Sequence, residues 1–331
     1  MNDRDLDAEV AATGIHRVPV PTPFAVGRVN SYLIDDDPLT LLDAGPNSGT
    51  SLEALIQGVR ALGHELEDIE LVLISHQHID HLGLVGVVAA RSGAEVAALD
   101  SLAPFAQRYG EHADADDRFA TQVMLTNGIP EDVVSALQSV SRAFRAWGAR
   151  ADVTRVLREG DSLEFADRTL VVRHRPGHSP TDTVFHDADR RLLLAADHLL
   201  PHISSNPLIA RPLDGSDRRP HALEIYMESM RQTRQMDLDI VLPGHGEPFT
   251  GHAELIDKRF ALHRRRADKL HALIVERPRS AYELAQALWG NIAVTQAYLT
   301  LSEVLGHTDL LMTEGRVTET DDDGVVRFEA A

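Results

Sequence analysis

Three histidines and an aspartate stand within six consecutive residues, His76, His78, Asp80 and His81, directly after the apolar run 71–75. Imidazole and carboxylate groups are the side chains that bind zinc and related divalent metals. Packing so many polar groups after an apolar strand is costly unless something pairs with them. The spacing therefore predicts a metal-binding loop.

Three further candidate ligands each follow a short apolar run later in the chain. They are His178, Asp197 and His245, which follow the runs 170–172, 192–196 and 240–242. In a layered α/β fold, corresponding ends of neighbouring strands converge on one edge, where binding crevices form. One tetrahedral zinc takes only about four ligands including a water. We therefore expect the candidates to meet around two metals that share a carboxylate.

These blocks resemble the metallo-β-lactamase-fold hydrolases, the superfamily that includes glyoxalase II, acyl-homoserine lactonases and the tRNA 3′-processing nuclease. The resemblance covers roughly residues 15–249, with the separate motifs in the family's order. It implies a first metal site of His76, His78 and His178, a second of Asp80, His81 and His245, and a bridging Asp197. It also implies that Asp43, in a strand-end Asp-x-Gly turn, supports the ligands from behind.

The chain contains no cysteine, which removes disulfides and thiolate metal ligands from consideration. Many true β-lactamases of this superfamily place a cysteine or a serine where the glyoxalase and lactonase types place the bridging aspartate. Because Asp197 stands at that position, the resemblance is to the glyoxalase II and lactonase-like branch. Antibiotic hydrolysis is disfavoured.

The predicted cofactors are two Zn²⁺ ions, although histidine and carboxylate sites also accept iron, manganese or cobalt. Two metals can hold a water between them and lower its pKa toward about 7. The resulting hydroxide would attack an ester, thioester or lactone carbonyl. We expect Asp80 to be both a ligand and a catalytic residue that orients the nucleophile and carries its proton to the leaving group.

Composition is that of an ordinary globular protein with 331 residues, 43% hydrophobic and 25% charged. No run approaches the roughly 18 apolar residues of a membrane span. Residues 1–7 form neither a basic nor an apolar leader region, so we expect a cytoplasmic protein. The net charge of −19 repels polyanions on average and disfavours nucleic acid as a partner.

Short apolar runs alternate with helical patterns through residues 1–250. Strands are expected at 40–42 and 71–75, and helices at 51–63, capped by Ser51, and at 82–92. Later runs predict strands at 183–185 and 192–194 and a helix at 220–235. With the resemblance, this predicts an α/β catalytic domain over 1–250 with the four-layer αββα sandwich of the metallo-β-lactamase fold.

A helical insertion is expected at about residues 101–150, where the break 127–130 separates two helices. Insertions here in similar proteins lie over the metal mouth, so we expect a lid that shapes the pocket. Most of its apolar residues are expected to serve in core packing, with at best a minority facing the substrate.

Residues 251–331 predict a small winged-helix-like C-terminal domain. Helices are expected at 253–274, at 281–288 with Ser280 as cap, and at 294–305, followed by a hairpin around 321–324. Nucleic-acid recognition is disfavoured because 292–311 contains no lysine or arginine, while the hairpin tip carries three aspartates. Packing on the core or a homo-oligomer contact is the expected role.

The leading hypothesis is a zinc-dependent dinuclear hydrolase that acts on a small acyl substrate. A phosphodiesterase or ribonuclease of the same fold is the first alternative, and salt-dependent RNA binding would distinguish it. A mononuclear iron persulfide dioxygenase, which uses the first-site ligands, is the second. A binding module with a relic site is the weakest hypothesis, since no ligand is missing.

Overall fold

The computed structural model describes residues 5–213, 215–216, 218–291 and 296–331. The chain forms two compact units. The first comprises Met1–His112, Phe144–Ser205 and Gln235–His252, and the second comprises Ala113–Ala143, Asn206–Arg234 and Ala253–Ala331. The expected domain boundary after residue 250 lies two residues before the last division, which falls between His252 and Ala253. Most of the expected lid, about residues 101–150, belongs to the second unit.

A six-stranded sheet opens the first unit. Its strands follow the order β1 (Ile15–Val20), β2 (Val29–Ile34), β3 (Thr40–Leu42), β4 (Leu71–Leu73), β5 (Glu95–Leu99) and β6 (Arg155–Leu157). The first three strands pair antiparallel and the others parallel. The strand expected at 71–75 ends early, because the backbone N–H of Ser75 donates to a side-chain oxygen of Asp43.

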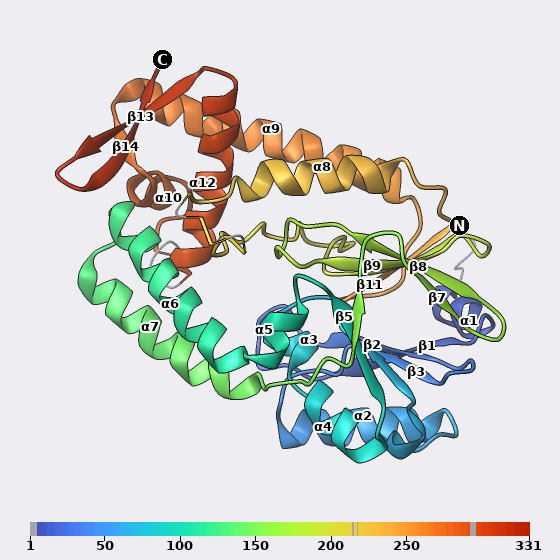
Figure 1. The fold of residues 1–331 in the computed structure, drawn as a ribbon. Helices are drawn as coiled ribbons and strands as arrows, with labels where there is room; N and C mark the ends of the chain where they lie inside the picture. The colour runs from blue at the N-terminus through green and yellow to red at the C-terminus, as the bar shows by residue number, and fades with distance from the viewer. Residues whose placement is uncertain (1–4, 214, 217, 292–295) are drawn as a thin grey trace. The chain divides into compact units, whose positions relative to one another are not determined.

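Helices α2 (Gly49–Ala61) and α4 (Val85–Ser92) lie along one face of this sheet (Figure 1). The expected cap was wrong, since Ser48 is the N-cap and its side chain accepts from the N–H of Ser51. The helix expected at 82–92 begins only at Val85, as α4, because the N–H of Leu84 bonds to the carbonyl of Gly45. Leu82 is instead the last residue of a separate one-turn helix, α3 (Ile79–Leu82).

The remaining helical segments of the first unit are short. They are α1 (Leu6–Ala11), η1 (Leu66–Asp68), α5 (Ala103–Gln107) and η2 (Arg145–Trp147).

A five-stranded sheet completes the first unit. In the order β11, β10, β9, β8, β7, it contains Ile240–Pro243, Leu192–Ala196, Thr183–Asp187, Thr169–His174 and Ser162–Glu164. Only the β10 and β11 pair is parallel among its described ladders. The strands expected at 183–185 and 192–194 are confirmed. One apolar core joins residues of both sheets, including Leu42 and Leu194, which gives the expected mixed α/β fold.

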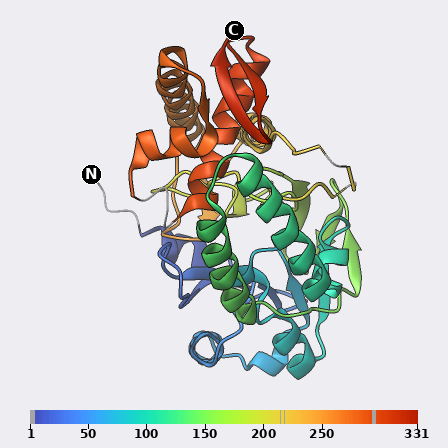
Figure 2. The same ribbon diagram turned by 90° about the vertical axis from the view of Figure 1, so that its left-hand side faces the viewer.

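The second unit contains the paired helices of the insertion. Helices α6 (Tyr109–Thr126) and α7 (Glu131–Phe144) run side by side in both views (Figure 2). The expected break is confirmed, since the N–H of Ile129 bonds back to Met124 across Gly128, whose φ is +86°.

The rest of the second unit is helical with a small sheet. It contains α8 (Ala222–Arg234), α9 (His252–Glu276), α10 (Ala281–Trp289) and α12 (Ala297–Thr313), with strands β12 (Arg279–Ser280), β13 (Val317–Asp322) and β14 (Val325–Ala330) in the order β12, β14, β13. Ser280 is confirmed as a cap, in a capping box with Glu283. The expected helix start at Val294 lies outside the described residues, and α12 continues past the expected end at Leu305.

Among the described residues, none of the helices has the length and hydropathy that a membrane span requires.

Candidate metal centre

The structure brings all seven predicted ligands together within the first unit. His76, His78 and His178 form the first group. Nδ1 of His78 lies 3.0 Å from Nε2 of His76 and 2.9 Å from Nε2 of His178. Three ring nitrogens this close are arranged as the donors of one small cation would be, because zinc holds imidazole nitrogens about 2.0–2.1 Å from itself.

Asp80, His81 and His245 form the second group. Nε2 of His245 lies 3.4 Å from Oδ2 of Asp80, and one donor atom of each of the three residues lies within 4.8 Å of the others. Asp80 and His81 occupy the one-turn helix α3, whereas His76 and His78 precede it. The start of α3 therefore divides the ligands of this short motif between the two groups.

Asp197 lies between the two groups. Its Oδ1 is 3.4 Å from Nε2 of His81, and its Oδ2 is 3.5 Å from Nε2 of His245 and 3.6 Å from Nε2 of His178. One carboxylate thus faces imidazoles of both groups, which is the position that a bridging ligand requires.

The donor set fits divalent cations. Nε2 of His81 and Oδ1 of Asp197 are buried, and neither atom has a hydrogen-bond partner within the described part of the chain. Buried polar atoms are normally paired, so two unpaired atoms that face each other indicate a missing partner. A cation between a nitrogen lone pair and a carboxylate oxygen satisfies both.

Asp43 contacts His81 on the side of the ring that faces away from Asp197 and so supports the second group, as the resemblance implied. Its Oδ2 accepts from Nδ1 of His81 at 2.7 Å and from the hydroxyl of Ser75 at 2.6 Å. The bond to Nδ1 leaves the bare Nε2 of His81 directed at Asp197. Asp43 has a φ of 56°, a left-handed conformation that aspartate tolerates better than most residues.

Two further bonds fix ligand orientation. Oγ of Ser75 lies 2.9 Å from Nδ1 of His76, and since this hydroxyl donates to Asp43 it accepts from the imidazole. Nδ1 of His245 donates to the carbonyl of Arg28 at 2.7 Å. Each bond leaves the lone pair of Nε2 free to bind a metal, which is the usual arrangement of metal-ligating histidines.

The metallo-beta-lactamase superfamily model matches residues 25–245. The chain belongs to this superfamily. It is 35% identical to the probable metallo-hydrolase YqjP of Bacillus subtilis strain 168, over 94% of this chain and 96% of that protein. These matches make it a probable metallo-hydrolase, and therefore an enzyme.

A solved structure shares the architecture along nearly the whole chain. It is the metallo-beta-lactamase family protein TTHA1429 from Thermus thermophilus, with a TM-score of 0.78 and 26% identity, covering 96% of this chain and 99% of that one. A shorter similarity joins the chain to the bovine acyl-coenzyme A thioesterase MBLAC2, 30% identical over 38% of this chain and 40% of that protein.

The first group of this superfamily member contains neutral imidazoles. Burial and the neighbouring imidazoles hold the pKa of His76 well below its usual 6.5. Burial and the nearby His178 lower the pKa of His78 to about 3. Both rings therefore have lone pairs for a metal at any physiological pH.

The second group carries the charge. Although burial opposes it, the carboxylates of Asp43 and Asp197 raise the pKa of His81 well above 6.5, so a metal that binds Nε2 takes the place of a proton. In turn, and again against burial, His245 and His81 hold the pKa of Asp197 well below its usual range. The carboxylate of Asp197 is thus an anion that a metal cation can neutralise.

Sequence reasoning missed two residues that shape the centre. The sequence pattern assigns Ser75 only to the end of a strand, although the residue directly precedes His76. Gly244 was counted only as part of a turn, yet a Cβ there would lie 2.1 Å from Oδ1 of Asp197 and 2.9 Å from the ring of His81. Only glycine fits, and that constraint arises from the packing of β10 against β11.

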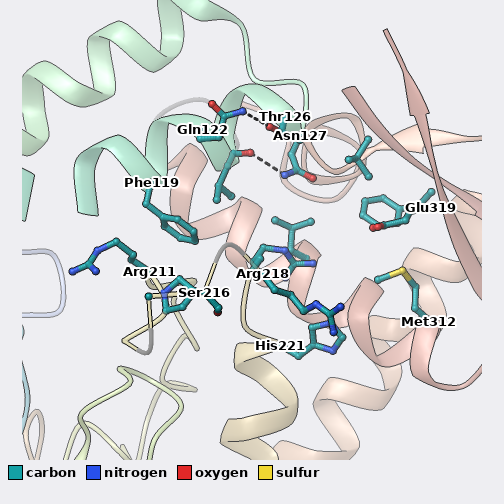
Figure 3. Close-up of a pocket in the computed structure, with 17 residues that line it drawn as sticks. Phe119, Gln122, Thr126, Asn127, Arg211, Ser216, Arg218, His221, Met312 and Glu319 are labelled. Atoms are coloured by element: carbon teal, nitrogen blue, oxygen red, sulfur yellow. Dashed lines mark hydrogen bonds between the residues drawn. The ribbon is translucent and has the colours of Figure 1, made fainter. Parts of the chain in front are cut away.

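A cavity of about 860 Å³ lies elsewhere, in the second unit (Figure 3). Its wall combines apolar side chains such as Phe119 with the cationic Arg211 and Arg218. None of the seven predicted ligands lines it, so it is no part of the candidate metal centre.

Proposed function

We propose that the protein is a dinuclear zinc hydrolase that acts on a small acyl substrate, a thioester, lactone or carboxylic ester. The observation that carries the proposal is the position of Asp197, which faces imidazoles of both groups at 3.4 to 3.6 Å. The name of the thioesterase MBLAC2, which matches part of the chain, makes a thioester the first substrate class to test.

Each group has a role in this proposal. His76, His78 and His178 would hold one metal, Asp80, His81 and His245 would hold the other, and Asp197, whose oxygens face His81, His178 and His245, would contribute to both. When bound, two divalent metals supply Lewis acidity for the carbonyl oxygen and lower the pKa of water toward about 7.

Asp80 is the proposed catalytic residue. Its side chain is 11% exposed, so it is reachable from solvent, and Oδ2 faces His245 at 3.4 Å. Although burial opposes it, the hydrogen bond to His245 and the charge of His81 lower the pKa of Asp80. The anionic carboxylate orients the attacking water and accepts its proton, which it then delivers to the leaving sulfur or oxygen.

For residues 251–331 we propose a packing role or a homo-oligomer contact rather than nucleic-acid binding. Helix α12 carries no lysine or arginine, and the tip between β13 and β14 carries Asp321, Asp322 and Asp323. A nucleic-acid reader needs cations for phosphates. The helices and hairpin of residues 251–331 keep the order of a winged-helix-like domain, which is the assignment we propose.

The test is a hydrolase screen on the zinc-loaded protein. Acyl thioester, lactone, carboxylic ester, nitrocefin and bis-phosphodiester probes are assayed with the unaltered chain and with Asp80→Asn. Zinc and iron are counted in each protein as purified, before zinc is added. We expect the zinc-loaded protein to turn over an acyl probe. Asp80→Asn should lower this turnover by at least about a hundredfold.

Two results would overturn the proposal. Turnover of the phosphodiester alone, with salt-dependent RNA binding, would replace it with the nuclease alternative. A preparation with about one iron and no zinc per chain, active on a persulfide with uptake of O₂, would replace it with the dioxygenase.

A further inference from the structure

Three aromatic side chains form a contiguous cluster in the first unit. The rings of Phe144 and Trp147 stack with centroids 5.1 Å apart, and Phe24 meets them edge-on at 5.6 Å and 5.7 Å. We call Phe24, Phe144 and Trp147 the aromatic trio.

The aromatic trio is not part of the hydrophobic core. Among the described residues, neither apolar cluster includes any of its members. Phe144 is 38% exposed, Phe24 and Trp147 are half-buried, and Val26 on the same loop as Phe24 is 40% exposed. Core aromatics such as Phe185 are fully buried. An exposed cluster of large apolar side chains indicates a binding surface rather than packing.

One side of the trio rests directly on the segment that carries two predicted ligands. The carbonyl of Trp147 accepts from the N–H of Asn47 at 2.7 Å. A Cβ on Gly83 would lie 2.3 Å from that carbonyl, and a Cβ on Gly148 would lie 2.8 Å from the side chain of Ile79. The backbone at Trp147 is thus packed against both ends of α3, whose middle residues are Asp80 and His81.

The other side of the trio is tied to a third predicted ligand. Phe24 lies on the loop 21–28 between β1 and β2. This loop ends at Arg28, whose carbonyl accepts from Nδ1 of His245 at 2.7 Å. Two segments held against the metal centre therefore converge in one exposed apolar surface.

We infer that the aromatic trio binds the acyl chain of the substrate, so that the preferred substrates carry an extended alkyl acyl group. This inference rests on the proposed acyl hydrolysis. An alkyl chain leaves water when it lies across aromatic faces, and each methylene so buried strengthens binding by roughly fourfold. A short acyl group would fill the metal centre without reaching the trio.

The test is a chain-length series. kcat/KM of the zinc-loaded protein is measured with butanoyl and dodecanoyl thioesters of one thiol, for the unaltered chain and for Phe144→Ala, Phe144→Leu and Phe24→Ala. The unaltered chain should prefer dodecanoyl by at least about tenfold. Each alanine variant should lose most of that preference while its butanoyl rate changes less than about twofold, and Phe144→Leu should keep part of it.

Val275→Ala is the matched control, because Val275 is 58% exposed on α9 in the second unit. It removes an exposed apolar side chain outside the trio and should leave the chain-length preference unchanged. A flat chain-length profile in the unaltered chain, or equal loss with both thioesters in the alanine variants, would overturn the inference.

A binding measurement distinguishes this inference from the proposed function. The chain has two tryptophans, so Trp289→Phe leaves Trp147 as the fluorescent reporter. Dodecanoate should change the emission of Trp147 saturably, butanoate should not at the same concentration, and Phe144→Ala should abolish the change. If no thioester is hydrolysed but this binding persists, the proposed function fails and the trio remains an alkyl-binding surface. Equal changes in Trp147 emission with dodecanoate and butanoate would overturn the binding role of the aromatic trio, whatever the enzyme hydrolyses.

Discussion

Nδ1 of His81 and Oδ2 of Asp43 are joined by a hydrogen bond of 2.7 Å in which both side chains are buried. The bond fixes the ring so that Nε2 faces the centre. In Asp43→Asn an amide replaces the carboxylate, so the ring loses a charged acceptor. Zinc affinity should fall by about 10- to 100-fold, as measured by competition with a chelator of known affinity.

Asp187→Asn is the control for this change. Asp187 is equally buried but pairs with Arg190, and it stands at the opposite end of β9 from Thr183, whose N–H bonds to Ser75. Its zinc affinity should match that of the unaltered chain. An unchanged affinity in Asp43→Asn would show that Asp43 does not support the metal.

The two groups of ligands should hold one metal each. His78→Ala and His245→Ala remove a donor from the first and second group respectively, so each variant should retain about one zinc per chain where the unaltered chain holds two. Metal analysis after dialysis checks this. His64→Ala, which removes a partly exposed histidine paired with Asp35, should retain both metals. Loss of both metals in each ligand variant would favour a single coupled site.

The sequence predicted the centre because its ligands follow apolar runs. His76, His178 and Asp197 stand just beyond strands of two different sheets. These sheets share one apolar core, and their packing brings the three residues together. Local capping was harder to predict. Ser48 and Ser51 are both serines at the start of one helix, and the hydrogen bond from Ser51 N–H to Ser48 selects between them only in three dimensions.

Features that depend on tertiary packing could not be predicted. The break between α3 and α4 exists because the N–H of Leu84 reaches the carbonyl of Gly45, a partner distant in the sequence. The grouping of the insertion helices with residues 253–331 also has no local signal. It depends on apolar contacts such as those of Val123 and Leu305 within one shared core.

A buried histidine pair in the second unit should make the free energy of unfolding depend on pH. Nδ1 of His263 lies 3.2 Å from Nε2 of His307, whose own Nδ1 donates to the carbonyl of Glu303 at 2.6 Å. Burial, with Arg266 and Arg259 nearby, lowers the pKa of His263 to about 4. The unfolded chain takes up this proton near pH 6.5, whereas the folded chain takes it up only near pH 4. The contribution of His263 to the free energy of unfolding is therefore full above pH 6.5 and is lost as the pH falls from 6.5 to 4.

Replacing the titrating group isolates its contribution. In His263→Gln this proton uptake is absent. From about pH 7 to about pH 4, the unaltered chain should therefore lose on the order of 3 kcal/mol more unfolding free energy than His263→Gln does. Denaturant unfolding at several pH values measures this difference, and contributions from the metal centre cancel. A difference that does not vary with pH would show that His263 titrates alike in both states.

Breaking a buried ion pair should destabilise the second unit. Arg219 donates to both oxygens of Asp309, at 2.7 Å and 2.5 Å, and the Asp309 side chain is fully buried. In Asp309→Asn the guanidinium loses its counter-charge in a site from which water is largely excluded. Because breaking a buried pair leaves an uncompensated charge, unfolding should become easier by about 3 kcal/mol, as measured by denaturant titration.

Asp257→Asn is the matched control, since Arg234 also donates two hydrogen bonds to Asp257, from Nε at 2.7 Å and from Nη2 at 2.8 Å, but about half of each side chain is exposed. Water and salt screen that pair, so the unfolding midpoint should stay where it is. The contrast tests burial rather than geometry as the source of the effect. Equal shifts in the two variants would mean that solvent reaches Arg219 and Asp309 as freely as it reaches the surface pair.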